Sequence, residues 1–143
     1  MPVPQAISLA FERYGEAMDS ARRNRRTIDG FLGIGSSGIE RCQDDFVSEL
    51  RAAVEGFAAA GPDSASAREA LEYIFSRARA GRRGDASYWM LLASHSLALP
   101  LVDFLSPADA LSMLEAYEAS FPKRERFPAQ KAVISALRAR GRA

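Results

Sequence analysis

The segment S-G-I-E-R-C-Q-D-D-F-V-S-E-L-R-A-A-V-E-G-F, residues 37–57, decides the fold. Its apolar residues recur three or four positions apart, which is the spacing of one face of an α-helix. They are Ile39, Cys42, Phe46, Leu50, Val54 and Phe57. Ser37 and Glu40 have the spacing of a capping box, in which each side chain satisfies a free backbone donor of the first turn. We therefore expect a helix that begins at Ser37 and ends before Gly61-Pro62.

Apolar stripes of the same period recur on both sides of this segment. They predict five further helices, over residues 4–25, 66–81, 85–99, 106–122 and 128 to near the C-terminus. Ser66, Asp85 and Ser106 are the expected N-caps, and Pro100 is expected to end or bend the fourth helix. No strand of useful length is predicted. The fold class that follows is all-α, a single-domain irregular bundle of about six helices.

Length and composition indicate one helical domain over residues 1–143. A chain of 143 residues with 48% apolar and 26% charged residues is typical of a globular domain with one hydrophobic core. The stripes place six large side chains in that core. They are Phe46, Leu50, Leu71, Ile74, Leu92 and Leu114.

The net charge of +1 hides an asymmetry between the two halves of the chain. Residues 1–72 carry eight Arg against twelve acids, and residues 73–143 carry eleven Lys or Arg against six acids. Nucleic-acid binding normally needs a concentrated basic surface. The near-neutral total therefore argues against nucleic acid as a partner.

Membrane insertion and secretion are not indicated either. Residues 86–102 form a run of 17 residues without a formal charge, the lower limit for a spanning helix, but the run contains three serines, His95 and Pro100. The N-terminus lacks the basic and apolar regions of a signal peptide. Cys42 is the only cysteine, so no internal disulfide can form. We expect a cytoplasmic protein with no membrane partner.

A glycine-rich segment, Gly30 to Gly38, is the longest expected connection between helices. Its second part, residues 33–38, reads G-I-G-S-S-G and matches the G-x-G-x-x-G pattern. The dinucleotide-binding version of this pattern follows a strand in a β-α-β unit, and no strand is predicted before it here. We interpret the segment as a connector, and we leave open an anion bound at the helix N-terminus near Ser37.

Candidate catalytic and metal-binding residues are few. His95 is the only histidine, so neither a multi-histidine metal site nor a catalytic triad can be assigned. Glu40, Asp44, Asp45 and Glu49 cluster on the second helix, but such a row is typical of a solvated helix face. We therefore expect no enzymatic activity, no metal and no cofactor.

One short motif suggests a ligand. Leu91-Leu92-Ala93-Ser94-His95, on a helix of an all-α chain, resembles the proximal-histidine helix of globins. The resemblance covers five residues and implies ligation of haem iron by His95. Globins also place a phenylalanine against the haem in a corner between helices, whereas the nearest candidate, Phe46, lies within a predicted helix. The resemblance at His95 gives our second interpretation, a small-ligand-binding domain with an apolar molecule or haem bound near His95 and Trp89.

Two basic segments suggest a protein-binding surface instead. They comprise Arg77, Arg79, Arg82 and Arg83 at the end of the third helix, and Lys123, Arg124 and Arg126 in a later turn. The acids on the second helix have the opposite sign, so copies of the chain could dock head to tail, or an acidic protein could bind. Our first interpretation is thus a non-enzymatic interaction or regulatory module that binds a protein partner or itself.

Overall fold

The computed structural model describes residues 4–25, 34–79 and 86–143, which form helices and no strand. The α-helices are α1 (Gln5–Arg25), α3 (Ile34–Ala59), α4 (Ser64–Arg79), α5 (Ala86–Ala93), α6 (Pro107–Ser120) and α7 (Pro128–Gly141). Two 3₁₀ helices, η1 (Ser94–Phe104) and η2 (Lys123–Glu125), complete the order. The expected all-α bundle of about six helices is confirmed.

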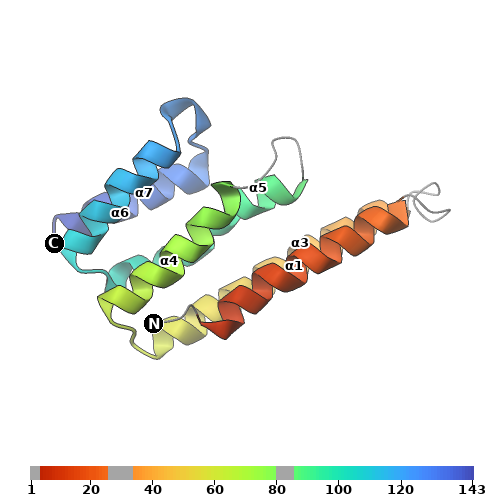
Figure 1. Cartoon of the computed structure of the whole chain (residues 1–143), viewed down its shortest axis with the longest axis horizontal. Coiled ribbons are helices and arrows are strands. Elements are labelled where there is room, and N and C mark those ends of the chain that lie inside the picture. The colour runs from red at the N-terminus through yellow and green to blue at the C-terminus, as the bar shows by residue number, and fades with distance from the viewer. Residues whose placement is uncertain (1–3, 26–33, 80–85) are drawn as a thin grey trace.

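Two helix pairs are joined through a central segment. α1 and α3 form a long antiparallel pair that extends to one side of the molecule (Figure 1). Phe11 and Tyr14 of α1 contact Phe46 of α3, with ring centroids 5.1 and 4.5 Å apart. α6 and α7 form the second pair, and α4 runs between the two pairs in this view. η1 contacts α3, α4, α5 and α7, so it lies at the centre of the bundle.

The form of η1 differs from the sequence expectation. The α-helix expected over residues 85–99 ends at Ala93, and the chain continues as a 3₁₀ helix through Pro100 to Phe104. The hydroxyls of Ser94 and Ser96 donate to the carbonyls three residues earlier, at 2.6 and 2.9 Å. Such bonds offer the backbone oxygens an alternative to α-helical partners.

No helix within the described ranges is long and apolar enough to cross a membrane.

Two expected capping boxes are wrong, and one expected cap is confirmed. α4 begins at Ser64, and its N-cap is Asp63, whose carboxylate accepts the Ser66 N–H at 2.8 Å. The charged oxygen is a stronger acceptor than a serine hydroxyl, and this hydrogen bond lowers the pKa of Asp63. Ser106 caps α6 as expected, accepting the Asp109 N–H at 3.1 Å. Asp85 lies outside the described residues.

The second wrong capping box is that of Ser37. α3 begins at Ile34, so Ser37 and Gly38 lie inside the helix and not at its start. A glycine in a helix interior costs about 1 kcal/mol relative to alanine. In proteins, however, tertiary packing contributes more to helical stability than intrinsic propensity does, and α3 packs against α1.

The core contains most of the side chains that the stripes place there. Phe46, Leu50, Leu71, Ile74 and Leu92 are buried. Leu114 is only half-buried at the edge of the core, so its assignment to the core is wrong. The buried face of α6 consists of Ala110, Met113 and Tyr117, which follow the helical period and leave Leu114 on the flank.

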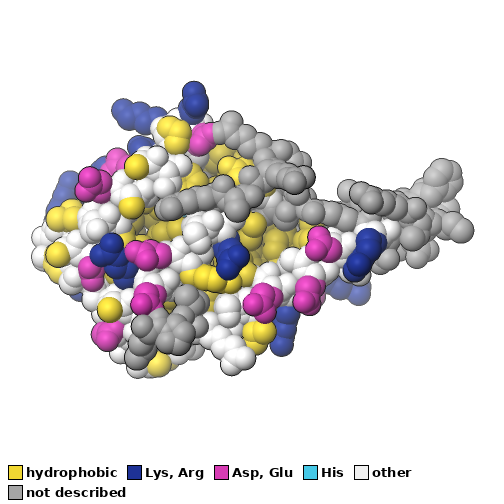
Figure 2. All heavy atoms as spheres, in the orientation of Figure 1, with side chains coloured by type: hydrophobic (Ala, Val, Ile, Leu, Met, Phe, Trp, Pro, Cys, Tyr) yellow, Lys and Arg dark blue, Asp and Glu magenta, His cyan; other side chains and the backbone are white. Residues whose placement is uncertain are grey.

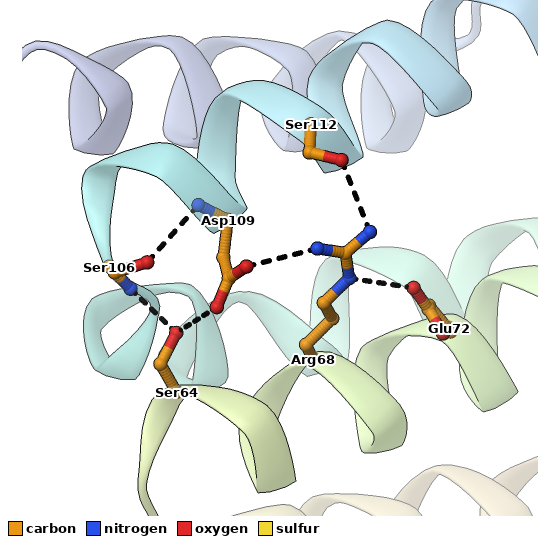
Figure 3. A network of polar contacts seen from close by, with 6 residues as sticks. All are labelled: Ser64, Arg68, Glu72, Ser106, Asp109 and Ser112. Atoms are coloured by element: carbon orange, nitrogen blue, oxygen red, sulfur yellow. Dashed lines mark hydrogen bonds and ion pairs between the residues drawn. The ribbon is translucent and has the colours of Figure 1, made fainter.

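A polar network joins the first turns of α4 and α6 (Figure 3). Ser64 Oγ donates to one carboxylate oxygen of Asp109, and Arg68 Nη1 donates to the other at 2.9 Å. Ser64 Oγ also accepts the N–H of Ser106 at 2.7 Å. The hydrogen bonds from Ser64 and Arg68 hold the pKa of Asp109 below its ordinary value. The network therefore fixes where one helix begins relative to the other.

A core truncation gives the first prediction. Leu50→Ala should lower the free energy of unfolding by about 2–5 kcal/mol, because Leu50 has no exposed surface and the neighbouring helices cannot close the cavity completely. Urea denaturation followed by circular dichroism measures this change. Leu111→Ala is the control: it removes the same atoms from a side chain that is 50% exposed, so it should cost clearly less than Leu50→Ala. Equal losses in the two variants would contradict the burial of α3.

The second prediction concerns the pH dependence of the network. Asp109→Asn keeps the shape of the side chain but removes its charge. Because the folded-state pKa of Asp109 lies below 3.8, its stabilisation is complete above about pH 5 and is lost as the pH falls through the folded pKa. The stability difference between wild type and variant should therefore stay constant near neutral pH and shrink toward about pH 3.

Denaturant unfolding at several pH values measures that difference. Asp103→Asn, at an exposed acid outside the network, is the control. A wild-type to Asp109→Asn difference that stayed constant down to about pH 2 would show that the charge of Asp109 does not stabilise the fold.

Candidate functional site

An apolar groove of about 510 Å³ lies between the α5–η1 segment and the start of α7. One wall consists of Trp89, Leu92, Ala93 and Ser96, which follow the i, i+3, i+4, i+7 spacing of one helix face. The opposite wall consists of residues 127–130 and 132. The groove therefore joins two segments that lie more than thirty residues apart in the sequence.

Two large aromatic side chains at this groove are exposed to solvent. Trp89 is 46% exposed and Phe127 is 40% exposed, and their rings pack edge to face with centroids 5.2 Å apart. In the described part of the chain, the one other exposed large apolar side chain is Leu111. Scattered single exposed apolar residues are normal, but two in contact over an apolar groove make this surface a candidate for binding.

A buried glutamine fixes the inner end of the groove. Gln130 has no exposed surface, and its Nε2 donates to the carbonyl oxygen of Leu92 at 2.9 Å. This hydrogen bond links α7 directly to α5, so it holds the two walls at a fixed separation. The amide nitrogen thereby gains the partner that a buried donor needs, whereas the buried amide oxygen, Oε1, has no hydrogen-bond partner among the described residues.

Three exposed cations lie close in sequence to the residues that line the groove. Lys123 and Arg124 in η2 precede Phe127 in the chain, and Lys131 follows Gln130; all three cations are exposed. Within the part of the chain that the structure describes, none of these three forms an ion pair. Figure 2 shows cationic side chains at the upper edge of the molecule, where Figure 1 places the α6–α7 connection.

Arg126 differs from its basic neighbours because its guanidinium group already has partners within the molecule. Its side chain is only 17% exposed, its Nε donates to the Phe121 carbonyl at 2.9 Å, and its Nη2 lies 3.6 Å from Glu118. Of the basic segment predicted to bind a partner, Lys123 and Arg124 thus remain available, and Arg126 supports the turn.

The other basic segment is only partly described. Arg77 is exposed on α4, with its guanidinium 4.2 Å from the ring centre of Tyr73. Arg79 ends α4, and its side chain lies outside the described residues, as do Arg82 and Arg83. The structure therefore brings Trp89 against Phe127, which directly follows the segment 123–126, and Arg77 is not among the residues that line the groove.

His95 lies in the core and not at the groove. It has no exposed surface, and its Nδ1 is 2.8 Å from the hydroxyl oxygen of Tyr117. The rings of Phe75, Tyr117 and Phe121 surround it, with centroids 5.0, 5.7 and 5.5 Å away. Trp89 and His95, which the sequence combined in one ligand site, thus belong to different environments, and a haem iron would have to displace packed rings to reach the imidazole.

The remaining sequence candidates do not form a site in the described residues. Within those residues, no three His, Cys, Asp or Glu side chains are grouped so that they could hold a metal ion. Glu49 lies 3.6 Å from Arg13 of α1. Of the glycine-rich segment, Gly30 and Gly33 lie outside the described residues. The helix N-terminus expected near Ser37 as an anion site is not found there, because α3 begins at Ile34.

Sequence reasoning missed Phe127 and Gln130. Gln130 carried a usable signal, because it lies three residues before Val133 on the buried face of its helix, where a polar residue is unusual. For Phe127, the sequence offered no signal beyond its position next to Pro128.

We found no family model, curated protein or solved structure that matches this chain. The groove must therefore be judged on its own geometry.

The third prediction tests the role of His95. His95→Gln should lower the free energy of unfolding by about 1–3 kcal/mol, because it disturbs a buried hydrogen bond and its aromatic surroundings. Haem added to the wild type should give no histidine-ligated absorption spectrum. Thermal unfolding and a haem titration provide the two measurements. A haem spectrum that is present in the wild type and lost in His95→Gln would show that His95 is a ligand.

Proposed function

We propose that this chain is a non-enzymatic interaction module, and that a protein partner docks an apolar side chain into the groove between α5 and α7. The observation that carries the proposal is the pair of exposed, touching rings of Trp89 and Phe127 at an apolar groove. The single half-buried cysteine, Cys42, suits a reducing compartment, so we place this function in the cytoplasm.

The exposure of the two rings favours a protein partner. Trp is among the residues that contribute most to binding at protein interfaces, where it lies at the centre of the contact and is covered by the partner. A small molecule inside the groove would leave the outer faces of Trp89 and Phe127 in water. A protein surface that inserts one side chain would cover both.

The walls of the groove are already positioned before binding. Gln130 bonds to Leu92 across the inner end, and Leu92 itself is buried in the core. Binding to such a preformed surface orders few additional groups, so less of the interaction free energy is lost as conformational entropy. This rigidity supports recognition by shape.

The polar lining supports binding more than catalysis. The groove wall contains two uncharged polar side chains, Ser96 and Gln130, and the amide nitrogen of Gln130 is already bonded to the backbone. A general acid or base must reach the reacting group within hydrogen-bond distance. None of the described lining residues is an acid, a base or a histidine.

A second candidate function is the binding of a small apolar molecule in the same groove. The volume of about 510 Å³ favours it, because ligand pockets commonly measure about 300–1,000 Å³. Native mass spectrometry of the purified protein would detect a retained molecule. Trp89 is the only tryptophan, so its fluorescence would report a ligand at this site directly.

The fourth prediction tests whether a partner binds at the groove and not elsewhere on the surface. Ala93 is exposed and lines the groove, so Ala93→Glu should place a carboxylate in the apolar site without disturbing the core. Proteins captured from native lysate by the wild type should be lost from this variant, with binding at least about tenfold weaker. Quantitative mass spectrometry of the captured proteins provides the measurement.

Ala52→Glu is the matched control, because it makes the same change at an exposed position of α3. This variant should capture the same proteins as the wild type. If Ala93→Glu, shown by circular dichroism to be folded, retains every captured protein, the groove is not the docking site.

A further inference from the structure

The exposed face of α7 carries a row of cations that begins beside the groove. Lys131, Arg138 and the C-cap residue Arg142 are exposed and are spaced seven and four residues apart, so they share one helix face. Phe127 and Pro128 line the groove and lie four and three residues before Lys131. Residues at these spacings are neighbours on a helix surface. This cationic row therefore starts next to the groove wall and extends along α7 for about 16 Å.

Few acids in this region neutralise the cations. Residues 121–143 contain seven Lys or Arg and one acid, Glu125, which lies between two arginines in the sequence. Arg138 lies 3.8 Å from Glu118 of α6, which also contacts Arg126. The other exposed cations of this region form no ion pair within the described part of the chain; they are Lys123, Arg124, Lys131 and Arg142.

The opposite wall of the groove does not offset this charge. Residues 86–102, which include the α5–η1 wall, carry no charged side chain. The exposed acid Glu115 of α6 lies toward the far end of α7, because Leu111, one turn before it, packs against Gly141. At the end of α7 that forms the groove, the described surroundings are thus apolar and cationic. They complement a ligand that is apolar and acidic.

We propose that the partner docked at the groove is an acidic amphipathic helix. Its apolar face enters the groove beside Trp89 and Phe127, and its carboxylates lie along the cationic row that starts at Lys131. This inference rests on the proposed function of the groove and names the chemistry of the partner. The charges steer the helix to α7, whereas the groove supplies the apolar contact.

A helix fits this surface better than an extended segment does. An extended peptide gains affinity when it adds a strand to the edge of a sheet, and the described residues form no strand. A helix satisfies its own backbone hydrogen bonds and places residues three, four and seven apart on one face. Small side chains occur on both walls of the groove, Ala93 on one and Ala132 on the other, so a helix can approach closely.

An anionic lipid surface is a poorer occupant. Exposed aromatic rings beside cations would also suit lipid headgroups. A bilayer, however, contacts what protrudes, and this site is a hollow of about 510 Å³. Trp89 and Phe127 pack against each other, and more than half of each residue is covered. A side chain that projects from a partner helix fills such a hollow, and a flat lipid surface does not.

Designed peptides test the charge of the partner. The probe is a peptide of about 18 residues made of Leu, Ala and Glu, arranged as a helix with a leucine face flanked by glutamates. In two companion peptides, Gln or Lys replaces every Glu. The acidic peptide should bind the wild-type chain at least about tenfold more tightly than the neutral one, and the basic peptide should bind most weakly. Trp89 is the only tryptophan, so a shift of its emission to shorter wavelength reports binding at the groove.

Charge reversal on α7 tests the cationic row. Lys131→Glu should weaken binding of the acidic peptide at least about tenfold and should strengthen binding of the basic peptide. Arg51→Glu is the matched control, because it reverses an exposed charge on α3, which contributes no residue to the groove. It should bind all three peptides as the wild type does. Raising the ionic strength from about 0.05 M to about 0.5 M should weaken the acidic peptide much more than the neutral one.

The outcomes distinguish this inference from the function on which it rests. Equal binding of the acidic and neutral peptides, lost for both in Ala93→Glu, overturns the acidic partner but keeps the groove as a docking site. An acidic peptide that binds Lys131→Glu or Ala93→Glu as tightly as the wild type binds elsewhere and overturns the inference. If no peptide binds, the helix is overturned as occupant, while capture of lysate proteins by the groove is still judged by Ala93→Glu.

Two further probes test the helix and the lipid alternative. An acidic peptide with a central proline, which breaks the helix, should bind at least about tenfold more weakly than the original. Equal binding of the two would show that the occupant need not be helical. Phosphatidylserine-rich vesicles should not bind the wild type. Vesicles that bind the wild type and not Lys131→Glu, while the acidic peptide binds neither, would identify a lipid surface as the partner.

Discussion

The packing of η1 at the centre of the bundle is the constraint on which the rest of the structure depends. Ala98, Leu101 and Leu105 of this region have no exposed surface, and η1 contacts both helix pairs through α3 and α7. A 3₁₀ helix rises about 2.0 Å per residue, so this segment extends further than an α-helix of equal length. The Nε of Arg140 donates to the Leu105 carbonyl at 2.6 Å and thereby ties the end of this region to α7.

The α5–η1 segment divides the aromatic residues of this part of the molecule into an inner and an outer group. The inner group surrounds His95 in the core, and the outer group, Trp89 with Phe127, lies at the surface. The hydrogen bond from Gln130 to Leu92 lies between α7 and α5 and holds the surface groove on the rigid core. In the function proposed above, such a support would favour selective contact, because the shape of the groove is set before a partner arrives.

The elements of the fold were largely predictable, and their boundaries were not. The stripe of Phe46, Leu50 and Val54 and the Ser106-Pro107 start signal have local causes, so the sequence alone indicated these helices. The start of α4 was misplaced because Asp63 and Ser66 are both capable caps, and propensity alone does not rank them. The change from α to 3₁₀ at Ser94 was missed because it accompanies packing against four other helices.

In the candidate site, the contrast between features with local causes and features set by packing between distant segments is larger. The sequence by itself determined that the chain is helical, that it lacks an obvious catalytic constellation, and that Trp89 and a basic turn near residue 124 were candidates for binding. The segment around Trp89 is apolar on nearly every side, so periodicity did not reveal which face was internal. The tertiary structure decided this by burying His95 against Tyr117 and by bringing Phe127 against Trp89. Local spacing fixes which residues share a helix face, but only packing between distant segments determines which face meets water.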